Sequence, residues 1–216
     1  MKTKTSSAFT LIELLVVIAI IAMPVFNVAV MNAQMTDALN NARQVGIALK
    51  IYANDNGGNY PNDKNSYGEN IATSNDAFRS LIPTYLDNEK VFTVSRSKVG
   101  AKCDNKIEPQ QEILKAGENH FAFITGLNSS SNSLWPLIVD STDGSGHYTK
   151  VETDLGGTWK GTKSVVVRAD TSAALVPLQG TSTQRFIPRQ DDPTKNALEL
   201  ADYMGAGAHL LEPARQ

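Results

Sequence analysis

The sequence predicts an α+β fold, in which one long N-terminal helix packs on a mostly antiparallel sheet. Residues 9–31 are almost continuously apolar, and apolar residues then recur every three or four positions from 35 to 52, which is the period of an amphipathic helix. From residue 120 onward, short segments rich in β-branched and aromatic residues alternate with turn residues, which predicts strands. An antiparallel sheet can bury one face and leave the other in water, and the long helix is the obvious cover for the buried face.

The overall composition excludes several classes of protein. The chain of 216 residues has 20 basic and 22 acidic side chains, so it gives no electrostatic reason to expect nucleic-acid binding. Cys103 is the single cysteine, which excludes an intramolecular disulfide and a multi-cysteine zinc site. His120, His147 and His209 do not stand at metal-ligand spacing with one another. No phosphate-binding loop or nucleophile motif is present, so we do not expect an enzyme.

The apolar segment at residues 9–31 is long enough to cross a membrane, which takes about 20 residues as a helix. Its fourteen large aliphatic or phenyl side chains, at about −0.3 to −0.6 kcal/mol each, contribute roughly −4 to −8 kcal/mol. One charged residue at the helix centre costs about +2.5 to +3.5 kcal/mol, so insertion is favoured. Lys2 and Lys4 precede the segment and predict a cytoplasmic N-terminus, with the rest of the chain outside.

Glu13 is the one charged residue within this segment. An acid inside a membrane span is costly and marks a functional site by default. If the chain is cut before Phe9, the new α-amine stands four residues from Glu13, on the same helix face. In an assembly, the amine of one subunit can also neutralise Glu13 of its neighbour. The simpler alternative is an interfacial glutamate that reaches the lipid headgroups.

The segment from Ala8 to Ala22, AFTLIELLVVIAIIA, resembles the start of the type IV pilin and type II secretion pseudopilin family. The resemblance implies that a prepilin peptidase removes residues 1–8 by cleavage between Ala8 and Phe9. It also implies methylation of the Phe9 amine, and it makes Glu13 the fifth mature residue, which acts in assembly. The chain departs from the family at Ala8, where glycine is usual, and we expect the small alanine to be accepted.

Pro24 also departs from the family pattern, because many relatives carry their helix-breaking proline later. Proline removes one helical hydrogen bond, so we expect a kink at this residue. The kink is either a tolerated feature of a transmembrane helix or a point that melts when subunits pack into a filament.

A secretory signal peptide is the rival interpretation of this N-terminus. Such peptides have an apolar region of about 7 to 15 residues followed by a small-residue cleavage site, and residues 31–33 offer one. The product would be a secreted binding protein or enzyme. The length of the apolar run and Glu13 within it argue against this interpretation.

The predicted organisation is a leader at 1–8, a transmembrane and assembly helix at 9–31, its amphipathic continuation at 32–56 and a globular head at 57–216. Gly57 and Gly58 predict the end of the long helix. In the head we expect a helix over 75–86, capped by Ser74 and shortened by Pro83. Strands are predicted at 120–125, 134–139, 163–168 and 173–178, with a turn at 170–172, a helix at 194–204 and a frayed last dozen residues.

The head extends the resemblance. Residues 41–61, NARQVGIALKIYANDNGGNYP, together with 135–137 and 159–163, are similar to pseudopilin-like proteins of planctomycete- and verrucomicrobia-type bacteria. This favours a type II secretion pseudopilin that promotes protein secretion. A type IV pilus subunit for adhesion, motility or DNA uptake is the alternative within the class. The implied partners are the prepilin peptidase and methyltransferase, the inner membrane and other pilin-like subunits, with the head in the periplasm or outside.

One loop of the head is a candidate for a cation. Residues 140–146, DSTDGSG, place Asp140 and Asp143 in a tight turn, and carboxylates with carbonyls suit calcium. Some secretion pseudopilins bind calcium in a late head loop, so the resemblance supports this interpretation. A plain Asp/Gly turn explains the same residues.

Overall fold

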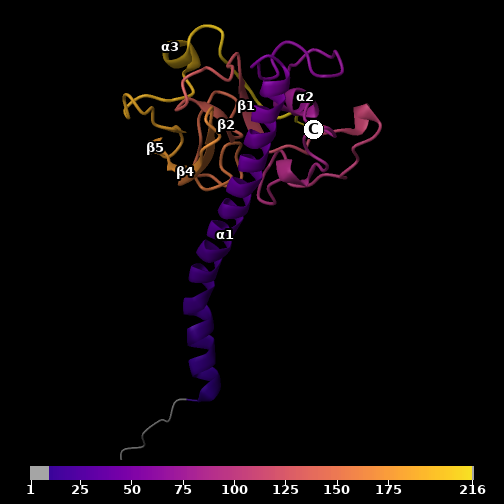
Figure 1. Ribbon diagram of the computed structural model, residues 1–216. Helices are drawn as coiled ribbons and strands as arrows, with labels where there is room; N and C mark the ends of the chain where they lie inside the picture. The colour runs from indigo at the N-terminus through magenta and orange to yellow at the C-terminus, as the bar shows by residue number, and fades with distance from the viewer. Residues whose placement is uncertain (1–9, 216) are drawn as a thin grey trace, which may run out of the picture. The chain divides into compact units, whose positions relative to one another are not determined.

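The computed structural model describes residues 10–215, apart from the side chains of Ala22 and Pro24. It divides into two compact units, Met1–Gln34 and Met35–Gln216. Helix α1, Leu11–Asp55, contributes to both units (Figure 1). The predicted cleavage between Ala8 and Phe9 lies outside the described residues.

The second unit contains a five-stranded sheet with the strand order β4-β3-β2-β1-β7, in which every neighbouring pair is antiparallel. This confirms the predicted α+β fold. The strands are β1 Phe121–Thr125, β2 Pro136–Asp140, β3 Lys163–Arg168, β4 Ala173–Pro177 and β7 His209–Leu211. A separate hairpin pairs β5 Gln179–Gly180 with β6 Arg185–Phe186, and the short helices are α2 Ser74–Arg79, α3 Leu200–Met204 and two 3₁₀ turns, Lys90–Phe92 and Gln110–Glu112.

The C-terminal part of α1 covers one face of this sheet (Figure 1). Gly46 supplies the closest approach, because a β-carbon added there would lie 2.6 Å from Cγ1 of Val167 and 3.9 Å from Cδ1 of Ile138. Ile138 pairs with both Phe123 and Val167 across the strands, so all three side chains share the covered face. The buried residues of α1 recur at the predicted spacing: Met35, Ala38, Ala42, Val45, Ala48, Leu49, Tyr52 and Ala53.

The second face of the sheet is also covered, at least over its central strands. Every residue of β1 and β2 is buried, although an antiparallel sheet with one wet face was expected. Val166 and Val176 line a small cavity together with Ile187, Ala197 and Tyr203. The segment that follows β6 therefore packs against this face, and the sheet is the middle layer of the head.

Helix α1 ends as its glycines predict. Gly57 has a φ of 64°, the left-handed conformation that glycine adopts without steric cost. The N–H of Gly58 donates to the carbonyl of Ala53 at 2.7 Å, which is the characteristic hydrogen bond of a Schellman cap.

Several predicted details of the head are wrong. The helix predicted at 194–204 forms only over α3, Leu200–Met204. The second helix stops at Arg79, and its N-cap is Thr73, which forms a capping box with Asp76. Ser74 is instead buried, and its hydroxyl donates to the carbonyl of Phe121 at 2.8 Å. The C-terminal residues are not frayed, because β7 adds to the edge of β1 and extends the sheet.

Candidate functional site

The first unit is a helix with an apolar surface on every side. Consecutive side chains from Leu14 to Ile18 are 45–59% exposed, and Leu11 is 81% exposed. Successive helical residues point about 100° apart, so this run surrounds the helix instead of forming one stripe. A helix that is hydrophobic all round belongs in lipid or in a protein core. An 18-residue window of α1 has a mean hydropathy of 2.7, enough by length and composition to cross a membrane.

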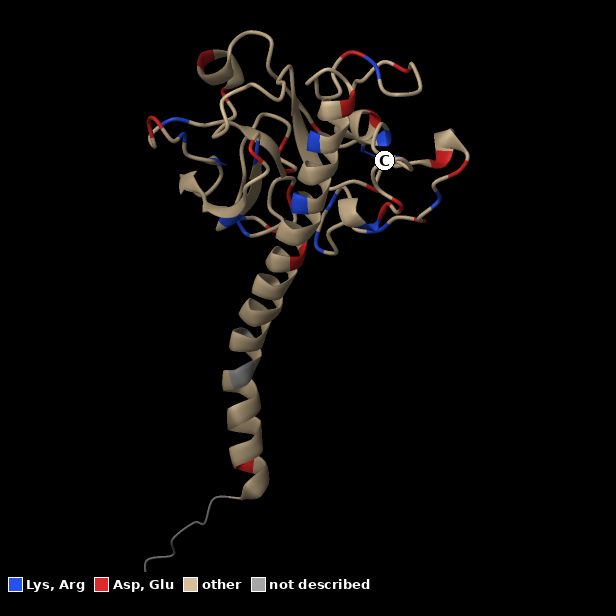
Figure 2. Ribbon diagram, in the orientation of Figure 1, with Lys and Arg blue, Asp and Glu red and all other residues tan. Residues whose placement is uncertain are grey.

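Glu13 is the single charged residue between Leu11 and Gln34 (Figure 2). Its Oε2 accepts hydrogen bonds from the backbone N–H and from the hydroxyl of Thr10, both at 2.8 Å. In return, the N–H of Glu13 donates to Oγ1 of Thr10 at 3.3 Å. These reciprocal bonds form a capping box at the start of α1. Glu13 therefore satisfies backbone donors of its own helix that lipid could not satisfy.

Thr10 caps the helix beside Glu13, and the sequence interpretation missed this role. Its signal was present, since Thr-x-x-Glu before an apolar run is the sequence pattern of a capping box. A cut before Phe9 leaves the peptide bond between Phe9 and Thr10 intact, so the cap survives removal of the leader. Pro24 lies within the continuous helical assignment of α1, and the kink there stays a prediction.

The two predicted calcium ligands of the head lie in different environments. Asp140, at the end of β2, is buried, and its Oδ2 accepts from Nε1 of Trp159 at 2.9 Å and from the N–H of Val165 at 2.7 Å. Its Oδ1 lies 2.9 Å from Nε2 of His120. Asp143 is exposed, and its Oδ1 accepts three hydrogen bonds from Ser145 and His147 within the loop. The bonds of Asp143 form an Asx-type turn, and calcium at this loop stays a prediction.

Ser97, His120 and Asp140 form a continuous chain of contacts. Nδ1 of His120 lies 2.8 Å from Oγ of Ser97, and the other ring nitrogen contacts Asp140. All three residues are buried, and Oγ of Ser97 already accepts from the N–H groups of Val99 and Gly100. A substrate cannot reach a hydroxyl enclosed in this way, so the chain of contacts links a loop, the residue before β1 and the end of β2 as a structural element.

Comparison with protein families gives one match, confined to the start of the chain. Residues 3–23 match the family described as the prokaryotic N-terminal methylation motif. No curated protein and no solved structure matches the chain. The match supports the type IV pilin-like resemblance of the N-terminus, whereas the resemblance of the head stays a prediction.

Proposed function

We propose that this chain, which carries the N-terminal methylation motif of type IV pilin-like proteins, is a non-enzymatic subunit of a type II secretion pseudopilus. Before assembly, the subunit resides in the inner membrane as a single-pass protein with its head on the outer side. A prepilin peptidase cuts between Ala8 and Phe9 and the new amine is methylated. The mature helix then packs with those of neighbouring subunits, and the filament promotes protein secretion.

The observation that carries this proposal is the apolar surface of the first unit together with Glu13. Side chains exposed on every side of a helix need a cover, first from lipid and then from the same segment of other subunits. The carboxylate of Glu13 is costly in lipid, so a positive α-amine on a neighbour favours association. The exposed apolar side chains and Glu13 thus support a structural role.

The pseudopilus assignment, as opposed to a pilus, rests on the resemblance of residues 41–61, 135–137 and 159–163 to pseudopilin-like heads. Deletion of the chain in its host separates the two. Loss of extracellular proteins supports a pseudopilus, whereas loss of adhesion, motility or DNA uptake with normal secretion indicates a pilus.

Mass spectrometry of the N-terminal peptide from isolated membranes tests the class. The expected peptide begins at Phe9 and carries one methyl group on its amine. Ala8→Glu, which places a charge beside the scissile bond, should leave the precursor uncut in the same membranes. Ala8→Gly is the matched control and should be processed at least as completely as the wild type. A soluble protein that begins near Gln34 would show that a signal peptidase releases the chain, and the proposal would fail.

A further inference from the structure

A buried carboxylate in the head has one oxygen without a partner. Glu89 precedes the 3₁₀ turn Lys90–Phe92 and has 0% of its surface exposed. Its Oε1 accepts a hydrogen bond from the N–H of Leu114, whereas Oε2 is buried with no hydrogen-bond partner among the described residues. A buried, unsatisfied charged oxygen is costly, and such atoms in a native structure call for an unseen ligand or proton.

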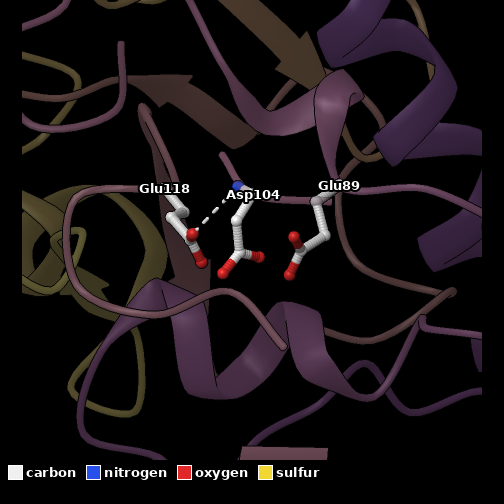
Figure 3. A group of neighbouring side chains, drawn as sticks. All are labelled: Glu89, Asp104 and Glu118. Atoms are coloured by element: carbon white, nitrogen blue, oxygen red, sulfur yellow. Dashed lines mark hydrogen bonds between the residues drawn. The ribbon is translucent and has the colours of Figure 1, made fainter. Parts of the chain in front are cut away.

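The carboxylate of Glu89 faces two further acids. One carboxylate oxygen each from Glu89, Asp104 and Glu118 lies within 4.8 Å of the others, and Figure 3 shows the carboxylate of Asp104 between those of the two glutamates. We refer to these three residues as the acid cluster. Glu118 is also buried, and backbone N–H groups of Asp104 and Lys115 donate to its two oxygens.

The charges around the acid cluster do not balance. Nζ of Lys115 lies 2.7 Å from Asp104 and 3.0 Å from Glu112, and Lys106 contacts the same two acids. Two ammonium groups therefore offset the charges of Asp104 and Glu112. In the described part of the chain, neither buried glutamate of the cluster has a lysine, arginine or histidine nitrogen within ion-pair distance. When both buried glutamates are ionised, their two negative charges equal the charge of one divalent cation.

We infer that the acid cluster binds a divalent cation of the calcium class. Three carboxylates are the hard oxygen ligands that Ca²⁺ prefers, and two ligands on opposite sides of Ca²⁺ stand about 4.6–5.2 Å apart, twice the usual bond length. The oxygens of the acid cluster lie within 4.8 Å of one another, which is inside this limit. Mg²⁺ requires shorter bonds in a near-ideal octahedron, and Zn²⁺ favours nitrogen and sulfur ligands.

Burial raises the pKa of Glu89, and the nearby Glu118 and Asp104 raise it further, although the hydrogen bond from the backbone N–H of Leu114 lowers it in part. A protonated Glu89 is thus the competing explanation for the unpartnered oxygen, and cation binding must displace that proton. Calcium affinity at the acid cluster should therefore weaken as the pH falls.

The test uses the full-length protein in detergent micelles, freed of metal with EDTA and dialysed. Addition of CaCl₂ to about one hundred times its Kd should raise the Tm by about 5–10 °C, and MgCl₂ should do less. Glu89→Gln and Glu118→Gln should each abolish the rise. Asp143→Asn is the matched control, since it removes an acid from the other candidate loop, and it should keep the full rise. Tb³⁺ luminescence of the wild type, reversed by Ca²⁺, gives a second readout if a glutamine variant fails to fold.

Two results would overturn the inference. In the first, calcium changes neither the Tm nor the Tb³⁺ luminescence of the wild type, which would mean that Glu89 is simply protonated. A calcium response that is lost in Asp143→Asn but kept in Glu89→Gln would place the ion at residues 140–146.

Discussion

Gly46 of α1 and Val167 of β3 stand in such close contact that one added methyl group has no room. A β-carbon at residue 46 would lie 2.6 Å from Cγ1 of Val167, a distance that real side chains do not adopt. Val167 is fully buried in the sheet, and its β-branched side chain has little rotamer freedom. The helix can therefore lie this close to the sheet only because residue 46 lacks a side chain.

Gly46→Ala should destabilise the head by about 1 kcal/mol. Overpacking costs about 1–3 kcal/mol, and the better helix propensity of alanine returns about 1 kcal/mol. Thermal unfolding followed by tryptophan fluorescence measures the change. In the Gly46→Ala, Val167→Ala double variant, the loss should be smaller than the sum of the two single losses, because the second change removes the clashing methyl. If the loss of stability in the double variant equals the sum of the two single losses, the close contact between residues 46 and 167 is refuted.

Glu13→Gln separates the two roles of Glu13. Glutamine keeps an oxygen for the capping box with Thr10 but removes the charge. If the charge drives association, Glu13→Gln and Glu13→Ala should both insert into the membrane and both lose most of their incorporation into filaments. Incorporation is measured by cross-linking with a reagent that does not react with cysteine and by counting the subunits in sheared filaments.

Thr10→Val is the converse control for Glu13. It removes the hydroxyl contact and keeps the carboxylate, so incorporation should stay near the wild-type level, with a helix cap weaker by about 1 kcal/mol. A wild-type yield of filaments from Glu13→Gln would mean that Glu13 acts as a cap alone.

Asp140→Asn should destabilise the head by about 1–3 kcal/mol, because the NH₂ group of asparagine would replace either the oxygen that accepts from Trp159 and Val165 or the oxygen that contacts His120. Asp143→Asn, in the exposed loop, should change the stability by less than about 0.5 kcal/mol. Urea unfolding of both variants in EDTA provides the comparison. Equal stabilities would contradict the structural role of the buried carboxylate.

The stability of the head should depend on pH through Glu212. Burial raises the pKa of Glu212 above its ordinary value near 4.5, although hydrogen bonds from Thr142 lower it in part. The folded state then holds a proton more tightly than the unfolded chain, so this contribution to stability falls as the pH rises from about 4.5 through the raised pKa.

Tm values measured between pH 4 and 8 should therefore fall less with pH in Glu212→Gln than in the wild type. Glu199→Gln, which changes an exposed glutamate, should follow the wild-type curve. A wild-type slope in Glu212→Gln would rule out this source of pH dependence.

The sequence predicted the parts of the fold that depend on local patterns. The period of α1 and its glycine stop at residues 57 and 58 are local signals, and so are the valine-rich residues of β3. Strand β7 was missed because a three-residue strand has too short a pattern, and only its pairing with β1 defines it.

The site residues divide in the same way. Glu13 was recognised because an acid within an apolar run is visible in the sequence alone. Its capping partner Thr10 lies only three residues away in the sequence. The acid cluster could not be predicted, because Glu89, Asp104 and Glu118 are separated in sequence by loops without a repeating pattern. Their convergence follows from how the turns after α2 fold, and no spacing rule encodes that.

The position of β7 has a consequence for biogenesis. Leu211 pairs with Phe123, and the carbonyl of Glu212 accepts from the N–H of Ser74, so residues 211 and 212 complete a layer begun much earlier in the chain. Long-range pairing of this kind is slow and leaves an open strand edge until it forms. The globular part can therefore mature only after residues 209–211 have left the ribosome, and a chain that stops before them would expose the edge of β1 to quality-control proteases.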